Sequence, residues 1–218
     1  MADSALGILG GTFDPIHCGH LELARDLYAA LPLRAVRLVP AGDPPHRRVP
    51  VASANHRLAM VELAAAGNPG LEVDAREIHR QGPSYTVVTL EELRAEEPLR
   101  PLALIVGADA FLGLPAWHRW RELFDLAHFV VVARPGVELD IGRAPALRDQ
   151  WESRRSDDAS ALRAAPAGAI VTQPVTAHDI SATAIRAELA RGAAGFDAVR
   201  SLLPPAVLAY IERNHLYR

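Results

Sequence analysis

The sequence predicts a doubly wound α/β fold, in which helices cover a parallel β-sheet. Short apolar runs alternate with longer segments whose apolar residues recur at helical spacing, which is typical of βα units. Two of the runs, residues 102–106 and 129–133, are apolar throughout, as buried strands of a parallel sheet are. Long loops with glycine, proline and histidine follow several of the runs, and parallel sheets bind ligands beyond the ends of their strands.

The expected elements follow from this pattern in chain order. Strands are expected at residues 6–9, 35–40, 71–74, 102–106, 129–133 and 169–172. Helices are expected at residues 19–31, 53–66, 86–97, 180–191 and 204–214. Ser53 suits the N-cap of the second helix, and Pro204 with Pro205 suits the start of the last one. The pattern weakens between residues 136 and 168, so we expect an exposed loop from Ser153 to Ser160.

Length and composition narrow the choice of protein class. A chain of 218 residues suits one domain, with a small helical part from about residue 180 to 218. The formal net charge of −3 argues against nucleic acid bound by bulk electrostatics. All 23 basic residues are arginine, and the one cysteine excludes an internal disulfide. No apolar stretch is long enough to span a membrane, and no signal peptide is visible, so we expect a cytoplasmic protein. The sequence does not predict an oligomeric state.

The segment from Gly10 to His20 carries the strongest chemical signal. Two glycines follow the first strand and precede a helix, where unpaired backbone N–H groups and the helix dipole attract phosphate. His17 and His20 are three residues apart, so we expect both rings to face one ligand. The competing explanations are an ordinary glycine turn, two surface histidines, half of a metal site, or an activated thiol at Cys18. The dinucleotide fingerprint and the P-loop pattern are both absent.

Two further loops follow expected strands and would line the same rim of the sheet. Residues 41–50 hold His46 and Arg47 on a proline-rich frame, which suits an incoming phosphate. A charged surface turn explains those two residues as well. Gly107 ends another expected strand and allows a sugar to approach the backbone, while Asp109 offers a carboxylate to its hydroxyl groups.

Histidine and arginine make the expected rim of the sheet cationic, and we call it the cationic rim. Aromatic and hydroxyl residues complete it. Trp117 and Trp120 lie three apart, so we expect one to cover the core while the other faces the cleft. Ser181 is expected to cap a helix, with Thr183 in the first turn and Arg186 one turn later. Hydroxyls, helix dipole and guanidinium would then share one anion. A plain capped helix explains the serine but not the arginine.

Taken together, these segments resemble the bacterial nicotinate mononucleotide adenylyltransferases of the nucleotidyltransferase superfamily. The matching segments are GGTFDPIHCGH, PPHR, SYT at Ser84 to Thr86, GADAFLGLPAWHRW, ISATAIR and the final VLAYIERNHLYR. They occur in the right order over nearly the whole chain. Pantetheine-phosphate adenylyltransferases share the first motif, but they are shorter and lack the middle block. The resemblance implies a Rossmann-like nucleotidyltransferase fold with a C-terminal helical extension.

The resemblance also implies roles for individual residues. ATP phosphates would be held by Gly10, Gly11, Thr12, His17, His20, Ser181, Thr183 and Arg186, with His17 and His20 as the catalytic pair. The adenosine ribose would be held by Gly107 and Asp109, and the phosphate of nicotinate mononucleotide by His46 and Arg47. The nicotinate ring would stack on Trp117, with Tyr85, Thr86 and the backbone of His118 near its carboxylate. Two departures are minor, because Arg47 replaces a common Lys and Ala182 a common Ser.

The reaction implied by the resemblance is attack of the 5′-phosphate of nicotinate mononucleotide on the α-phosphorus of ATP. The products would be nicotinate adenine dinucleotide and pyrophosphate. Mg²⁺ would be carried with ATP, and no protein ligand to a metal is expected. Two alternatives stay open. One is adenylyl transfer to nicotinamide mononucleotide or phosphopantetheine, and the other is a module that binds ATP without turnover.

Overall fold

The structure is a computed structural model that describes residues 4–44, 49–133, 139–175 and 180–218. Its strands are β1 (Ala5–Gly11), β2 (Leu33–Pro40), β3 (Leu71–Val73), β4 (Leu102–Gly107), β5 (His128–Ala133), β6 (Arg155–Ser156) and β7 (Ile170–Pro174). They form one sheet in the order β3-β2-β1-β4-β5-β7-β6. The pairs β1–β4, β4–β5, β5–β7 and β6–β7 are parallel. Strand order reverses between β1 and β4, so the predicted doubly wound fold is confirmed.

The longer helices lie where the apolar pattern predicts them. The α-helices are α1 (Cys18–Ala30), α2 (Ala54–Ala65), α3 (Arg76–His79), α4 (Thr86–Glu96), α5 (Ala108–Leu112), α6 (Leu123–Leu126), α7 (Arg148–Arg154), α8 (Ala161–Ala164), α9 (Ala182–Leu189), α10 (Ala193–Ala198) and α11 (Pro205–Arg213). Single 3₁₀ turns are η1 (Leu114–Ala116), η2 (Trp120–Glu122), η3 (Ile141–Arg143) and η4 (Pro145–Leu147). The hydroxyl of Ser53 accepts a hydrogen bond from the His56 N–H at 3.3 Å, as an N-cap does. Among the described helices, none combines the length and apolar character needed to cross a bilayer.

The chain divides into two compact units. The first comprises Met1–Leu9, Asp26–Arg37 and Tyr85–Ala177, and the second comprises Gly10–Arg25, Leu38–Ser84 and His178–Arg218. Both units draw on separate stretches of the sequence. Neither unit is therefore a continuous segment of the chain.

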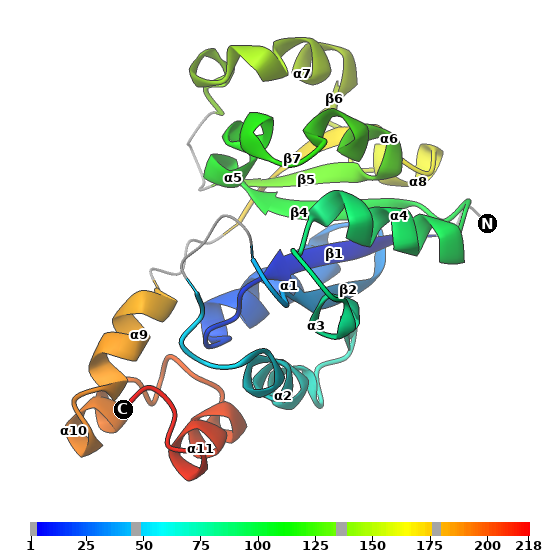
Figure 1. The fold of residues 1–218 in the computed structure, drawn as a ribbon. Coiled ribbons are helices and arrows are strands. Elements are labelled where there is room, and N and C mark those ends of the chain that lie inside the picture. The colour runs from blue at the N-terminus through cyan, green and yellow to red at the C-terminus, as the bar shows by residue number, and fades with distance from the viewer. Residues whose placement is uncertain (1–3, 45–48, 134–138, 176–179) are drawn as a thin grey trace. The chain divides into compact units, whose positions relative to one another are not determined.

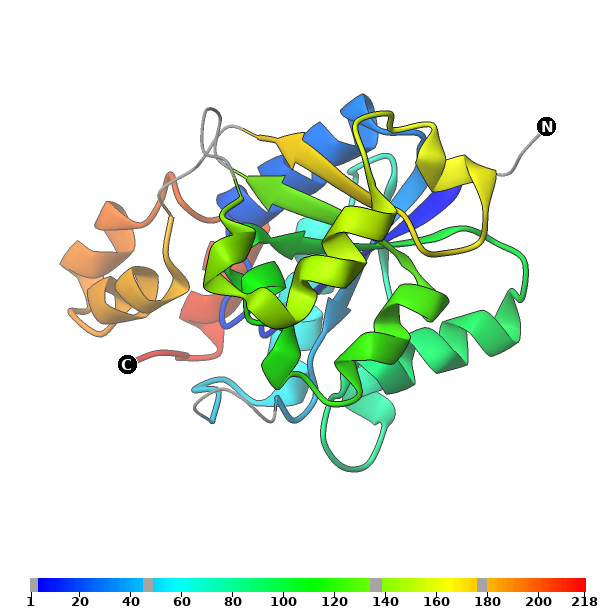
Figure 2. The same cartoon turned by 90° about the horizontal axis from the view of Figure 1, so that it is seen from above.

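The core of the first unit lies around β4 and β5. These strands run side by side with β7 (Figure 1), and Leu104 of β4 pairs with Phe129 of β5. Phe129 is fully buried, and its ring centroid lies 4.6 Å from that of Phe124 and 5.6 Å from that of Phe111. The helices α4 and α6 pack against each other in the same unit (Figure 2). The burial of nearly all of both strands explains why residues 102–106 and 129–133 are apolar throughout.

The expectation of an exposed loop from Ser153 to Ser160 is wrong in part. Its first residues end α7, and the next two form β6, in which Arg155 pairs with Ile170 of β7. Leu147 and Leu162 are fully buried before and after this stretch. Each of these short elements buries at most one apolar side chain, namely none in α7 and β6, Leu147 in η4 and Leu162 in α8. That number is too small to produce a readable period in the sequence.

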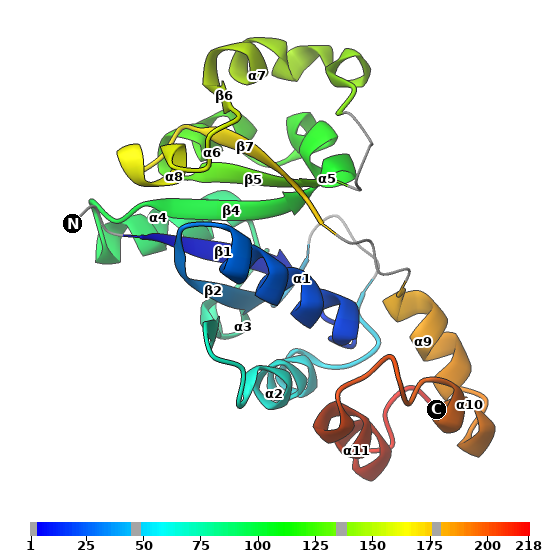
Figure 3. The ribbon, with the colours of Figure 1, turned by 180° about the vertical axis from the view of Figure 1, so that it is seen from behind.

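The second unit contains a group of helices that includes α9, α10 and α11. The last of these packs against α2 (Figure 3), and a hydrogen bond of 2.9 Å joins His56 Nδ1 and the Tyr210 hydroxyl. A methyl group at Gly195 would overlap the carbonyl oxygen of Glu188, so α10 can approach α9 only because position 195 is glycine. The predicted helical C-terminal part is present, with α10 as an element that the sequence pattern did not predict.

His128 is a fully buried polar side chain at the start of β5. Its Nδ1 accepts a hydrogen bond from the Ala169 N–H at 3.0 Å, so the proton is on Nε2, which donates to the Ala165 carbonyl at 2.8 Å. Burial lowers the pKa of His128 below its ordinary value of 6.5. The folded protein therefore holds a neutral imidazole that links the start of β5 to the backbone of Ala165 and Ala169.

We expect the free energy of unfolding to fall as the pH drops below 6.5, because His128 gains its proton in the unfolded chain before it does in the folded protein. Each pH unit in this range removes at most about 1.4 kcal/mol per buried histidine. Chemical unfolding at pH 7.5 and 5.5 measures the effect, which should be smaller in His128→Gln than in the wild type. The same substitution at the exposed His79 is the control. An unchanged pH dependence in His128→Gln would contradict this account.

Candidate functional site

The segment after β1 begins the candidate site in the second unit. Gly10 is exposed, and nothing lies within 4 Å of the place where a side chain would be, so a ligand can reach its backbone. A Cβ at Gly11 would lie 2.9 Å from the ring of Phe13, so position 11 requires glycine. Phe13 itself has a φ of 50°, in the left-handed region. Thr12 is partly exposed between them, and its carbonyl accepts a hydrogen bond.

His17 and His20 lie together, as the spacing predicts. Their ring centroids are 3.7 Å apart with an interplanar angle of 29°, and the edge of Phe13 packs against His20. The backbone N–H of His17 donates to Nδ1 of His20 at 3.3 Å, which leaves the proton of a neutral His20 on Nε2. His17 is 7% exposed, and its Nδ1 has no hydrogen-bond partner in the described part of the chain. The pair thus contains one buried ring nitrogen without a partner, at His17 Nδ1, and one ring N–H, at His20 Nε2.

Burial keeps this histidine pair uncharged. Desolvation lowers the pKa of His17 to about 4, and desolvation together with the neighbouring His17 lowers the pKa of His20 to about 3. Near neutral pH the two imidazoles contribute hydrogen bonds and not positive charge. The expected cationic rim is therefore uncharged at these two positions.

The helix α9 brings Thr183 and Arg186 to the same segment. Arg186 donates to the carbonyl oxygen of Asp14 at 2.7 Å and to the Thr183 hydroxyl at 3.3 Å. Ser181 occupies the N-cap position as predicted, but its exposed side chain makes no capping hydrogen bond. The Ser181 hydroxyl therefore does not satisfy the backbone N–H groups that begin α9.

The loop expected to hold a phosphate lies partly outside the described residues, because His46 and Arg47 belong to the stretch 45–48. Its two flanks are described and firmly held. The N–H groups of Gly42 and Asp43 donate to the Ser84 hydroxyl at 2.9 and 3.2 Å. On the other side, the N–H groups of Val51 and Ala52 donate to the Asp14 carboxylate at 2.8 and 3.1 Å.

The first unit holds the aromatic residues of the prediction. Tyr85 precedes α4 as its N-cap residue and Thr86 begins the helix, while the rings of Tyr85 and His118 lie 4.3 Å apart at 30°. Trp117 is partly buried, whereas Trp120 is 7% exposed and carries the Arg121 guanidinium over its ring. Trp120 is thus the covered tryptophan, and that Trp117 faces the cleft stays a prediction.

The turn between the two tryptophans is not helical, contrary to the spacing argument. Trp117 has an extended backbone, and Arg119 is left-handed with a φ of 52°. The Arg119 guanidinium pairs with Glu91 of α4 at 2.7 Å and with Glu122 at 2.5 Å. These two ion pairs hold the turn against α4 in a conformation that non-glycine residues rarely adopt.

Gly107 and Asp109 lie at the end of β4, where the prediction puts them. Gly107 is exposed, precedes α5 as its N-cap residue and has open space where a side chain would be. Asp109 is exposed in the first turn of α5. An exposed glycine with an exposed carboxylate next to it suits contact with sugar hydroxyls.

Sequence reasoning missed three residues that hold the second unit's loops, namely Asp14, Arg57 and Tyr217. Asp14 lies inside the first motif and Tyr217 inside the final segment, but neither was assigned a role. Arg57 stands among apolar residues of α2 and is 1% exposed. A charged residue on the buried face of an amphipathic helix was the available signal for Arg57.

The described residues provide no protein-made metal site. No group of three or more His, Cys, Asp or Glu side chains is arranged to hold an ion among them. The exposure of Cys18 is intermediate, and burial raises the pKa of its thiol, which works against an activated thiolate.

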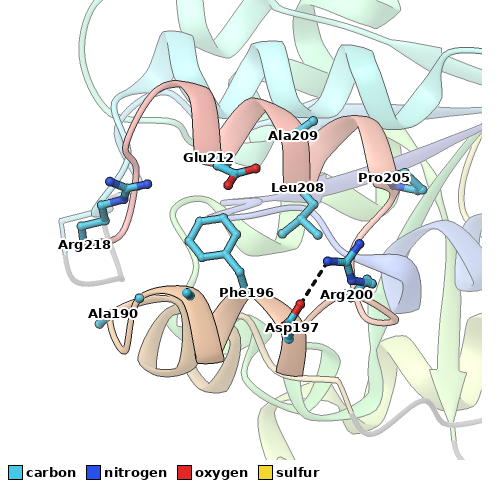
Figure 4. Close-up of a pocket in the computed structure, with 11 residues that line it drawn as sticks. Ala190, Phe196, Asp197, Arg200, Pro205, Leu208, Ala209, Glu212 and Arg218 are labelled. Atoms are coloured by element: carbon cyan, nitrogen blue, oxygen red, sulfur yellow. Dashed lines mark hydrogen bonds and ion pairs between the residues drawn. The ribbon is translucent and has the colours of Figure 1, made fainter.

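A pocket of about 760 Å³ lies in the second unit, lined mainly by residues of α10 and α11. Figure 4 shows Phe196 and Leu208 facing each other across it, with Asp197 and Arg200 paired at 3.0 Å on its wall. None of its lining residues belongs to the predicted site.

Comparison with known proteins gives a consistent set of relatives. The family model described as cytidylyltransferase-like matches residues 8–188. A probable nicotinate-nucleotide adenylyltransferase of Dechloromonas aromatica is 51% identical over 98% of this chain and 97% of its own length. A protein of the same description from Acidithiobacillus ferrooxidans is 48% identical over 98% and 95%. Plasmodium falciparum nicotinic acid mononucleotide adenylyltransferase complexed with NaAD has the same fold, with a TM-score of 0.73 at 15% identity over 98% of this chain and 97% of that chain.

We expect His17 and His20 to stay neutral at pH 6 in the ligand-free protein, because burial lowers their pKa values to about 4 and about 3. Long-range ¹H–¹⁵N correlation spectra between pH 7.5 and 5 report the charge and tautomer of each ring, and His20→Asn assigns the signals. The Nδ1 of His20 should give the shift of an unprotonated acceptor. A titration midpoint near 6.5 for either ring would contradict this account of their burial.

Proposed function

We propose, from the premise that this chain belongs to the cytidylyltransferase-like family and within it to the nicotinate-nucleotide adenylyltransferases, that it joins nicotinate mononucleotide to ATP. The products are nicotinate adenine dinucleotide and pyrophosphate, in the synthesis of NAD. The observation that carries the proposal is the stacked, uncharged histidine pair at the start of α1, in the same motif as the open backbone of Gly10. We further propose that the chain acts as one nucleotidyltransferase domain in the cytoplasm.

The triphosphate of ATP is assigned to residues of the second unit. These residues are Gly10, Gly11, Thr12, His17, His20, Ser181, Thr183 and Arg186. Open glycine backbone supports the assignment, because phosphate oxygens can reach N–H groups there. The Arg186 guanidinium, bound to the Asp14 carbonyl, supports it with a fixed positive charge beside the same segment.

The remaining contacts are assigned to loops that begin at other strands. Gly107 and Asp109 hold the adenosine ribose, and the phosphate of nicotinate mononucleotide goes to His46 and Arg47. Trp117 stacks on the nicotinate ring. The carboxylate of the nicotinate meets Tyr85, Thr86 and the backbone N–H of His118. The contact between the Tyr85 and His118 rings supports a common role for these residues in acceptor recognition. A carboxylate met by N–H donors favours the acid over the amide.

The reaction requires alignment more than chemical activation. A 5′-phosphate oxygen of the acceptor attacks the α-phosphorus of ATP, and the bond from that phosphorus to the oxygen between the α- and β-phosphates breaks, so that this oxygen leaves with pyrophosphate. The acceptor phosphate is already an anion at neutral pH, so no general base and no covalent intermediate are needed. The His20 N–H donates to the phosphates, and its hydrogen bond strengthens as charge builds up on the leaving group. A bound polyanion also raises the low pKa values of His17 and His20.

We also propose that Mg²⁺ enters with ATP, bound to the nucleotide's own phosphate oxygens. The described residues supply no ligand set for it, so we assign no protein group to the ion.

A panel of acceptors tests the proposed function. Purified protein is incubated with ATP and nicotinate mononucleotide, nicotinamide mononucleotide or phosphopantetheine, and pyrophosphate release is measured. We expect kcat/KM for the nicotinate compound to exceed that for the amide at least about tenfold, since the amide lacks the paired charge. ATP without an acceptor is the control. A faster reaction with another acceptor would reassign the substrate, and ATP binding in calorimetry without pyrophosphate from any acceptor would indicate a non-catalytic module.

The His20→Ala variant tests the catalytic assignment. We expect kcat to fall about 10²- to 10³-fold, because a donor aimed at developing charge acts in the transition state. The KM for ATP should change much less, since ground-state binding is shared among many groups. Steady-state kinetics measure both quantities, with His79→Ala on the exposed part of α3 as the control. Unchanged turnover would remove His20 from the catalytic residues.

A further inference from the structure

Asp14 is a buried carboxylate that gathers four segments of the second unit. It is 6% exposed. Its two oxygens accept hydrogen bonds from the N–H groups of Val51 and Ala52 at 2.8 and 3.1 Å. The Tyr217 hydroxyl donates to the same carboxylate at 2.8 Å, and Arg186 donates to the Asp14 carbonyl at 2.7 Å. Asp14 is thus linked to residues 49–52, which we call the 49–52 flank of the loop, and also to α9 and to the end of the chain.

The Arg57 side chain holds the backbone around the same loop. Its guanidinium donates to the carbonyls of Ala41 at 2.5 Å, Gly42 at 3.0 Å, Thr12 at 2.8 Å and Ala52 at 3.3 Å. Arg57 therefore binds the backbone on both sides of residues 43–51, and it also binds the backbone of the first motif. The hydrogen bond from Arg57 to the Thr12 carbonyl, directly after β1, does not involve the Asp14 carboxylate.

Tyr217 completes the set of donors around the Asp14 carboxylate. Its side chain is buried, and its φ of 66° shows that the turn carrying it is held in the left-handed region. Burial, and then the charge of Asp14, raise the pKa of Tyr217 far above its ordinary value, so the hydroxyl keeps its proton and donates. The Tyr217 hydroxyl and the Ala52 N–H donate to the same oxygen, Oδ1 of Asp14. Without the hydroxyl, the Ala52 N–H would be the one donor of this group left on Oδ1.

We propose that Tyr217 is a positioning residue that acts through Asp14 on the 49–52 flank of the loop assigned to the acceptor phosphate. The inference rests on the proposed function, because that function gives the loop its substrate. The Tyr217 hydroxyl fixes the orientation of the carboxylate, and the carboxylate fixes the backbone of Val51 and Ala52. Binding of the acceptor should therefore depend on Tyr217, whereas binding of ATP should not.

The Tyr217→Phe variant tests the proposal, with Tyr210→Phe as the matched control. Tyr210 also ties the C-terminal helices to the rest of the second unit through its hydroxyl, but its partner is His56 and not Asp14. In Tyr217→Phe we expect the KM for nicotinate mononucleotide to rise about tenfold, as expected from losing a hydrogen bond to a charged group. The KM for ATP should change less than about twofold, and Tyr210→Phe should alter neither constant.

Amide hydrogen exchange gives a second readout that needs no substrate. In Tyr217→Phe, we expect the N–H groups of Val51 and Ala52 to exchange at least about fivefold faster than in the wild type, since their acceptor is less firmly held. In Tyr210→Phe their exchange should be unchanged.

The outcomes separate this inference from the proposed function. Faster exchange at Val51 and Ala52 with an inactive wild type would support the link and reject the assigned reaction. Equal losses of activity in Tyr217→Phe and Tyr210→Phe, with both KM values unchanged, would mark Tyr217 as a purely structural residue and overturn the inference. Unchanged exchange in Tyr217→Phe would also overturn it.

Discussion

The loops of the second unit depend on one buried guanidinium. The irregular segments after β1 and β2 cannot satisfy all their carbonyl groups with hydrogen bonds to each other, and buried carbonyls need partners. Arg57 supplies them, with donors to four carbonyl oxygens from the segments around Thr12, Ala41 and Ala52. Lysine has three donors on one atom and could not span these groups, so an arginine is required here. The glycine-rich segment can stay open to a ligand because the buried Arg57 side chain holds its backbone at the Thr12 carbonyl.

The same solution recurs in the first unit. Arg94 of α4 donates to the carbonyls of Arg100, Leu126 and Pro166 at 2.7, 2.7 and 3.0 Å. It thereby joins the end of α4 to the segments that precede β4, β5 and β7. A sequence whose basic residues are all arginine thus uses several of them as ties for backbone and not as surface charges. Arg119 is different, because it is exposed and its partners are the carboxylates of Glu91 and Glu122.

The fold was predictable where an element buries a long apolar surface. The strands at 102–106 and 129–133 and the helix from Ser53 had strong local signals, and they lie where these signals predict. Short elements such as β6 were not predictable, because their formation depends on pairing with a distant strand. For the site, the glycines and histidines of the first motif were readable as a group. The Asp14 carboxylate was not, since its donors come from positions 51, 52 and 217, which no local pattern connects.

The close stacking of His17 on His20 limits the charge that this part of the protein can carry. Two imidazolium ions with centroids 3.7 Å apart would repel each other strongly in a setting with little water. The first proton to arrive therefore makes the second one harder to add, and the two rings titrate as a single unit. The pair therefore takes up one proton far more readily than two. When an anion binds, one added proton on either ring can supply a single positive charge beside it.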